Sequence, residues 1–184
     1  MRYAMVVDLD RCIGCRTCAV ICKGHHAQPE GIWWNRVFVP GAPEYGTSVL
    51  NEEGQPRMEF LPVSCQHCDD APCQSVCPTG ATYTDDTGTV LVDYERCIGC
   101  RYCMAACPYQ VRTRNSKTGE VDKCRFCTLS SYENGTKMCS CVDACLTGAR
   151  IFGDLDDSDS EISKEIARTG AAPIAGDLTR AKIY

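Results

Sequence analysis

The hydrophobic positions of this chain fall into short segments separated by polar and glycine-containing turns. Residues 1–9 alternate weakly and include the β-branched residues Val6 and Val7, which predicts a short strand. Residues 82–84 and 89–93 flank a turn-forming Asp-Asp-Thr-Gly sequence and predict a β-hairpin. The pattern therefore predicts an α+β chain of short strands, short helices and long loops.

One longer helix is predicted near the end of the chain. Ser158 and Glu161 have the spacing of a capping box, and Gly170 ends the pattern, so the helix should run from about residue 159 to 169. The polar residues that follow, 171–184, form a tail. Because polar tails are ordered only when docked, we expect this one to lie on a partner protein.

The sequence predicts no direct membrane span. No apolar run approaches the roughly 18 residues that crossing a bilayer requires. The N-terminus reaches Asp8 without an apolar core, so it does not predict a secretion signal. Membrane attachment or export is therefore expected to come through a partner.

The composition changes this picture because the chain of 184 residues contains 17 cysteines. So many cysteines in a short chain usually indicate a disulfide scaffold, but here the count is odd and the cysteines stand in ligand-spaced groups. Val, Ile, Leu and Phe make up only about 18% of the residues, below the level typical of a chain that builds its own hydrophobic core. We therefore expect metal clusters to replace part of that core.

The net charge argues against nucleic-acid binding. The formal charge is -5, and four oxidised clusters held by sixteen thiolates would lower it to about -13. A nucleic-acid-binding chain carries the opposite sign. Basic residues beside the cysteines are expected to offset the cluster charge and tune the potentials: Arg11, Arg16, Lys23, Arg96, Arg101, Lys123 and Arg125.

The strongest motif is Cys-x2-Cys-x2-Cys-x3-Cys-Pro at residues 97–108. This spacing is that of bacterial ferredoxins, in which three cysteines bind one [4Fe-4S] cluster and the fourth serves a neighbouring cluster. The first cysteine group has the same spacing, and residues 7–22 match 92–107 at ten of sixteen positions. The match indicates an internal duplication. The two groups are Cys12, Cys15, Cys18, Cys22 and Cys97, Cys100, Cys103, Cys107.

Two more groups complete the set. Cys73-x3-Cys77 is followed by Pro-Thr-Gly-Ala, and Cys141-x3-Cys145 by Leu-Thr-Gly-Ala. This repeat assigns the last group and leaves Cys139 over, with Cys139 as the alternative ligand. The assigned groups are Cys65, Cys68, Cys73, Cys77 and Cys124, Cys127, Cys141, Cys145.

Other chemistries fit these residues less well. Structural zinc would use paired Cys-x2-Cys groups, but it gives no reason for the longer run to occur twice. A Rieske centre or a c-type haem requires histidines at positions that this chain does not offer, so the three histidines are expected to be structural or on the surface. Phosphate-binding and dinucleotide-binding glycine motifs are absent. The chemistry that the sequence indicates is one-electron transfer, without a catalytic residue.

These motifs resemble the iron–sulfur electron-transfer (beta) subunit of the dimethyl sulfoxide reductase family of molybdopterin oxidoreductases. The order of the four groups, Cys-Pro-Thr-Gly-Ala at 77–81 and Gly-Asp-Leu-Asp-Asp at 153–157 carry the resemblance over essentially the whole chain. The chain is similar in particular to the small subunits of polysulfide, tetrathionate and arsenate respiratory reductases. Leu146, where the family usually has proline, departs from the pattern.

The resemblance implies four [4Fe-4S] clusters in two interleaved ferredoxin-like modules. One module would comprise 1–24 with 109–158, the other 60–108, with 25–59 as an inserted loop region and 159–184 as helix and docking tail. In the inserted region, Trp33 and Trp34 could belong to a local core or anchor a partner. The implied ligand sets are site A (Cys12, Cys15, Cys18, Cys145), site B (Cys22, Cys124, Cys127, Cys141), site C (Cys65, Cys68, Cys73, Cys107) and site D (Cys77, Cys97, Cys100, Cys103).

The resemblance also implies partners and a location. The chain would relay electrons to or from a molybdopterin catalytic subunit in anaerobic respiration, with a quinol-oxidising membrane subunit or another protein as electron donor. It would be peripheral on the plasma membrane, exported together with a signal-bearing partner, with a cytoplasmic complex as the alternative. A stand-alone polyferredoxin is the second functional hypothesis.

Overall fold

The structure is a computed structural model that describes residues 1–42, 49–57, 59–128 and 139–184. Its elements are short, as the hydrophobic pattern predicted. In chain order they are β1 (Tyr3–Val7), α1 (Thr17–His25), β2 (Arg36–Phe38), β3 (Val49–Leu50), β4 (Pro56–Arg57), β5 (Leu61–Val63), α2 (Pro72–Ser75), β6 (Thr82–Thr84), β7 (Val90–Val92), α3 (Tyr102–Ala105), β8 (Thr113–Arg114), β9 (Val121–Asp122), α4 (Ser140–Asp143), β10 (Arg150–Asp154), α5 (Glu161–Thr169) and the 3-10 helix η1 (Gly176–Leu178).

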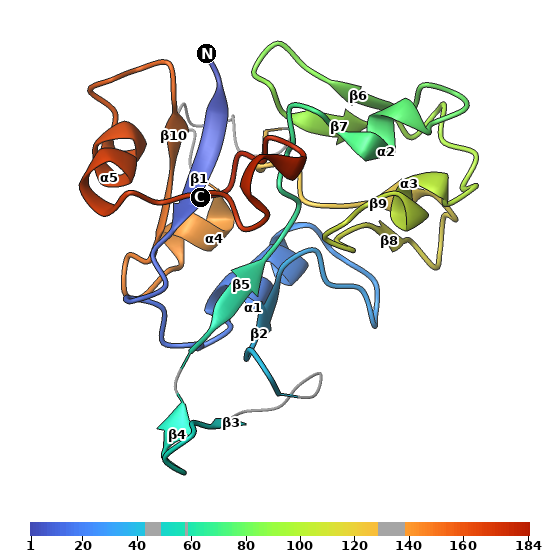
Figure 1. Cartoon of the computed structure of the whole chain (residues 1–184). Coiled ribbons are helices and arrows are strands. Elements are labelled where there is room, and N and C mark those ends of the chain that lie inside the picture. The colour runs from blue at the N-terminus through green and yellow to red at the C-terminus, as the bar shows by residue number, and fades with distance from the viewer. Residues whose placement is uncertain (43–48, 58, 129–138) are drawn as a thin grey trace.

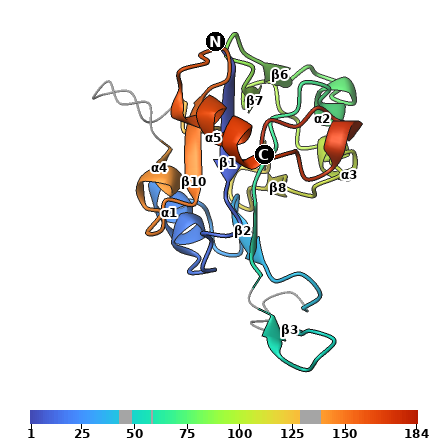
Figure 2. The ribbon, with the colours of Figure 1, turned by 60° about the vertical axis from the view of Figure 1, so that its left-hand side comes forward.

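The strands pair as antiparallel two-stranded sheets: β1 with β10, β2 with β5, β3 with β4, β6 with β7, and β8 with β9. Figure 1 shows β1, β10, α4 and α5 on one side of the molecule and α2, α3 and β6 to β9 on the other. The β3–β4 pair projects away from both, as Figure 2 also shows. The predicted α+β class, the first strand and the hairpin are confirmed.

The β1–β10 side has a small aliphatic core. Val6 lies opposite Ile151 in the sheet, and Ile162 of α5 is fully buried against both. The helix approaches β10 closely at Gly153, where an added Cβ would lie 2.9 Å from a methyl group of Ile162. The amphipathic helix thus closes one face of a sheet too small to bury itself.

The other side is built around cysteines as much as aliphatic residues. Val90 and Val121 are buried in one cluster with Cys68, Cys73 and Cys103. Val121 belongs to β9, so the β8–β9 hairpin packs beside the second and third cysteine groups. The module boundary expected at residue 108 stays a prediction, and this packing favours a boundary nearer residue 122.

The C-terminal tail differs from the expectation of an extended segment held by a partner. Ile183 forms a parallel bridge with Met5 of β1, and the backbone N–H of Asp69 donates to the carbonyl of Arg180 at 3.1 Å. The tail therefore contacts both sides of the molecule, and Figure 1 shows the C-terminus beside β1. Docking on a partner stays a prediction for its outer face, where Ile174 and Leu178 are exposed.

The N-terminal end of α5 lies near its predicted position, but its cap is Ser160 rather than Ser158. The Ser160 hydroxyl accepts a hydrogen bond from the backbone N–H of Ser163 at 3.3 Å. Replacement of Ser160 by Ala is expected to destabilise the chain by about 1 kcal/mol and to lower Tm by about 2–4 °C in thermal unfolding of the cluster-loaded protein. The matched variant Ser158→Ala should leave Tm unchanged, and equal losses would contradict the assignment.

Candidate iron–sulfur sites

The four cysteines of site A line one cavity. Cys12, Cys15 and Cys18 come from the loop before α1 and its first turn, and Cys145 arrives from the loop after α4. Burial raises the pKa of the Cys12 thiol, and the nearby Cys18 and Cys145 thiols act in the same direction. Cysteines far apart in the sequence thus line one cavity, and their binding of one cluster stays a prediction.

Site B lies between two packed helices. Cys22 on α1 and Cys141 on α4 are buried where these helices contact each other. Burial, followed by the Cys141 and Cys127 thiols, raises the pKa of Cys22 to about 12. Burial also raises the pKa of Cys124, and Cys22 and Cys141 act on it in the same direction. The four expected ligands of site B are therefore adjacent.

The cysteines of site C line a second cavity. Cys65, Cys68, Cys73 and Cys107 surround it together with Val90 and Val111. Burial raises the pKa of Cys68 to about 11, with Cys65, Cys73 and Cys107 contributing in the same direction. Cys107 therefore lies in the cavity of the second cysteine group, although in sequence it belongs to the third.

Site D is assembled by α2 and α3, which pack together. Burial raises the pKa of Cys103, and Cys77 and Cys100 add to this effect. Cys97 packs against the same buried cluster as Cys103. Cys100 is exposed, so this site reaches the surface.

The thiol chemistry fits [4Fe-4S] clusters. None of the seventeen cysteines forms a disulfide, so the chain is not held together by the disulfide bonds that stabilise many small cysteine-rich domains. Thiolate sulfur is the ligand that iron–sulfur clusters use. Bound there, the clusters would supply one-electron redox chemistry, with each site offering four cysteines.

The Cys-x-Thr-Gly-Ala sequences have a physical reason at the sites. Burial acts to raise the pKa of Cys77, but the backbone N–H groups of Thr82, Thr79 and Ala81 donate to its sulfur and lower the pKa to about 7. Backbone N–H groups of the equivalent loop likewise outweigh burial at Cys145 and lower its pKa. The glycine in each loop has φ of +63°, which turns these N–H groups toward the sulfur. Leu146 is 76% exposed, so it replaces the usual proline without disturbing the loop.

The duplicated loops before α1 and α3 share an unusual backbone. Gly14 and Gly99 both have φ of +66°, and Arg16 and Arg101 occupy left-handed positions at the helix starts. A Cβ at Gly99 would lie 2.6 Å from the backbone oxygen of Gly119, whereas at Gly148, φ +63°, nothing lies within 4 Å. The Gly99 position therefore combines backbone strain with a backbone collision.

Replacement of Gly99 by Ala is accordingly expected to cost clearly more than the roughly 1–2 kcal/mol of left-handed strain. Thermal unfolding of the cluster-loaded protein should show a larger loss of Tm than in Gly148→Ala, which carries the strain alone. Iron content should fall first at site D. Equal losses of Tm in the two variants would contradict this account of the loop.

Cys139 is the cysteine that the spacing left over. Its thiol is 1% exposed and donates to the carbonyl of Phe126 at 3.0 Å. The neighbouring Cys139 thiol is also the largest cause that lowers the pKa of Cys127, to about 4. The position suits a hydrogen-bond donor beside site B.

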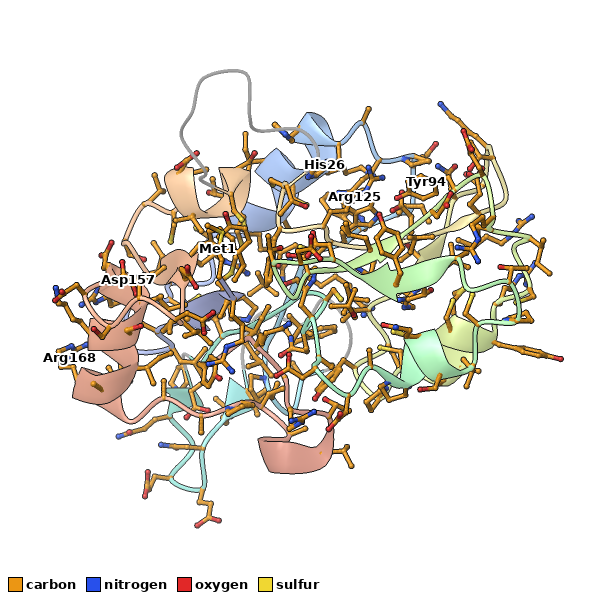
Figure 3. The ribbon with its side chains drawn as sticks, turned by 90° about the horizontal axis from the view of Figure 1, so that it is seen from above. Met1, His26, Tyr94, Arg125, Asp157 and Arg168 are labelled. Carbon is orange, nitrogen blue, oxygen red and sulfur yellow. The ribbon has the colours of Figure 1, made fainter. Side chains whose placement is uncertain are left out.

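The tryptophans and histidines occupy packing positions. Trp34 is buried and stacks on His26 and under the Arg125 guanidinium, which also lies 4.8 Å from the Tyr94 ring. Figure 3 shows Arg125 between His26 and Tyr94. His67 is fully buried against Phe126, and burial holds its pKa well below the usual value. Trp34 thus belongs to a local core, while Trp33 lies under Lys23 nearer the surface.

Two basic residues at the sites were not singled out from the sequence. Arg112 and Arg150 are each 4% exposed, and each bonds to a cysteine sulfur: Arg112 to Cys73 at 2.9 Å, Arg150 to Cys141 at 3.7 Å. Their shared position in the sequence could have identified them, because each arginine stands five residues after the last cysteine of its group. Of the seven basic residues that were singled out, Lys123 alone is fully buried.

This fold and these thiol groups define a ferredoxin-type iron–sulfur protein. Two families, both described as 4Fe-4S dicluster domains, match the chain over residues 56–155 and 11–81. The first match covers more than half of the 184 residues. The chain belongs to the 4Fe-4S dicluster family.

Similar proteins indicate which kind of iron–sulfur protein the chain resembles. The chain is 46% identical over 182 residues to the thiosulfate reductase electron transfer subunit PhsB of Salmonella typhi, covering 94% of this chain and 91% of the relative. It is 43% identical over 187 residues to a Halobacterium salinarum protein named as an iron–sulfur subunit of dimethyl sulfoxide reductase, covering 90% and 71%. A tetrathionate reductase subunit of Salmonella typhimurium is 41% identical over 162 residues, covering 88% and 62%. The chain is thus homologous to iron–sulfur subunits of these reductases, and the resemblance stated from its motifs is confirmed.

Proposed function

We propose that this chain relays single electrons through four [4Fe-4S] clusters, held at sites A to D, to or from a molybdopterin catalytic subunit of a reductase complex. The observation that carries the proposal is that the cysteines of each proposed set lie close together in the fold and that none of them forms a disulfide. The homology to electron-transfer subunits supports it. The substrate chemistry then belongs to the partner chain.

The contacts between sites support the order A, B, C, D. Arg150 lines the cavity of site A and bonds to Cys141 of site B. Cys65 of site C influences Cys124 of site B. Arg112 lines the cavity of site C, and its charge lowers the pKa of Cys103 of site D against the effect of burial. A linear order of this kind carries electrons from one end of the molecule to the other.

The two ends of this order are the ones that reach the surface. Cys15 of site A and Cys100 of site D are exposed, whereas sites B and C have no exposed cysteine. Ile13 and Ile98, the residues after the first cysteine of each duplicated loop, are 56% and 68% exposed. Exposed apolar groups beside a redox centre are suited to a protein partner, so electrons would enter at one end and leave at the other.

The partners follow from the same proposal. The reductase subunits that resemble this chain belong by name to enzymes for dimethyl sulfoxide, thiosulfate or tetrathionate, and a compound of this class is proposed as the terminal acceptor. In the part of the chain that the structure describes, no helix is long and apolar enough to cross a bilayer. A membrane subunit and export with a signal-bearing catalytic partner remain parts of the proposal.

The test is purification of the tagged chain from its own anaerobically grown organism. A large subunit with bound molybdopterin is expected to co-purify. Addition of the acceptor to the reduced complex should then oxidise the clusters, and EPR spectra would measure this oxidation. Isolation of a stable monomer with all its clusters and no large subunit would instead favour a stand-alone polyferredoxin.

A further inference from the structure

Four basic side chains are buried in the described part of the chain: Arg112, Lys123, Arg150 and Lys182. Lys182 is neutralised, because its ammonium group lies 3.0 Å from a carboxylate oxygen of Asp69. Among the described residues, no Asp or Glu forms an ion pair with the other three. A buried cation without a counter-charge is costly, so the compensating charge must come from another group.

Arg150 lies between sites A and B. Its guanidinium lines the site A cavity and donates to Cys141 of site B at 3.7 Å, while its other terminal nitrogen donates to Asn35 at 3.0 Å. Burial lowers the pKa of Arg150, but the thiolates of Cys141 and Cys18 outweigh burial and raise it overall. One cation thus faces cysteines of both sites.

Lys123 lies between sites B and C. Its ammonium group donates to the carbonyl of Cys124, a site B cysteine, at 2.8 Å and to the carbonyl of Val90. Val90 lines the site C cavity. Burial lowers the pKa of Lys123, and the thiolates of Cys65 and Cys124 oppose that shift. These contacts place the charge at the junction of the two halves of the cluster chain.

Arg112 lies between sites C and D. It lines the site C cavity and donates to Cys73 at 2.9 Å and to Thr82 at 3.2 Å. Its charge also acts on Cys103 of site D, where it opposes the effect of burial on the Cys103 pKa. Thr82 stands five residues after Cys77, the same offset that separates Arg112 from Cys107 and Arg150 from Cys145. The two arginines are therefore equivalent positions of the repeat.

We propose that Arg150, Lys123 and Arg112 are the counter-ions of the cluster chain, one in each gap between successive clusters, and that each raises the reduction potential of the clusters on both sides of its gap. Reduction adds a negative charge to a cluster, and a fixed cation nearby stabilises that charge. The same cation weakens the repulsion between two neighbouring reduced clusters. This inference rests on the four clusters of the proposed function.

The test is a redox titration followed by EPR on the purified cluster-loaded protein with Lys123→Met, which removes the charge and keeps an unbranched side chain. At a fixed potential, the reduced-to-oxidised ratio of the clusters at sites B and C should fall at least tenfold, about 59 mV for one electron. The clusters at sites A and D should change less than threefold. Lys117→Met, at an exposed position, is the matched control and should change no cluster by more than twofold.

A Lys123→Met protein with full iron content and ratios within twofold of the wild type at sites B and C would overturn the proposal. Where Lys123→Met binds less iron, Lys123→Arg decides: full iron content supports the need for charge, and an equal loss of iron overturns it. Iron content of the wild-type protein separates this outcome from failure of the four-cluster assignment itself. Arg112→Met should act in the same way on sites C and D.

Discussion

Replacement of Cys107 by Ser is expected to damage the cluster at site C before the cluster at site D. Cys107 belongs by sequence to the group that begins at Cys97, but its side chain lines one cavity with Cys65, Cys68 and Cys73. A hydroxyl is a harder and weaker ligand for iron–sulfur clusters than a thiolate. Iron analysis of the purified variant should show the loss of up to about four irons, and EPR should show one altered or missing cluster signal.

Cys139→Ser is the matched control for this prediction. Cys139 is buried and donates to the Phe126 carbonyl, and a serine hydroxyl can make the same hydrogen bond. Full iron content is expected in Cys139→Ser. Loss of the site D cluster alone in Cys107→Ser would show that the cluster pairing is wrong, and loss of a cluster in Cys139→Ser would make Cys139 a ligand.

Removal of the clusters is expected to unfold most of the chain. The hydrophobic cores on both sides of the molecule contain cysteines. Arg112, Lys123 and Arg150 are buried, and the charges nearest to them are cysteine sulfurs. Each such cation left without thiolates costs several kcal/mol, against a total stability of about 5–15 kcal/mol for an ordinary domain. The expected result is loss of the near-UV circular dichroism and of cooperative thermal unfolding after anaerobic treatment with a chelator and an oxidant.

Reconstitution with iron, sulfide and a thiol reductant is the control for that experiment, and it should restore both signals. Chemical damage to the chain would prevent this recovery. A cluster-free chain that keeps its near-UV spectrum, with Tm within a few degrees of the loaded protein, would contradict the claim that the clusters replace a hydrophobic core.

Local patterns predicted the local structure well. The hairpin at 82–93 was predictable because its turn residues stand between two apolar segments, and α5 because its end is marked by Gly170 in the left-handed conformation. The cap was misplaced by two residues because Asp and Ser alternate through 157–160, and each of these residue types can cap a helix. Spacing also predicted which cysteines belong together within each group.

Long-range packing was beyond the sequence pattern. Residues 109–122 lie with the second and third cysteine groups because Val121 is buried there. The sequence of two short strands does not predict which side of the molecule they pack on. The tail pairs with β1 through Ile183, although its composition suggested exposure. Arg112 and Arg150 look like surface residues in sequence, and only the thiols that surround them in the fold explain their burial.

The count of iron and acid-labile sulfide per chain tests the central claim most directly. Protein purified anaerobically, with its concentration fixed by amino-acid analysis, should contain about sixteen irons and sixteen sulfides, as four [4Fe-4S] clusters require. After reduction by dithionite it should give EPR signals of several interacting clusters. A value markedly below sixteen, or a colourless zinc-containing protein with no EPR signal, would contradict the account.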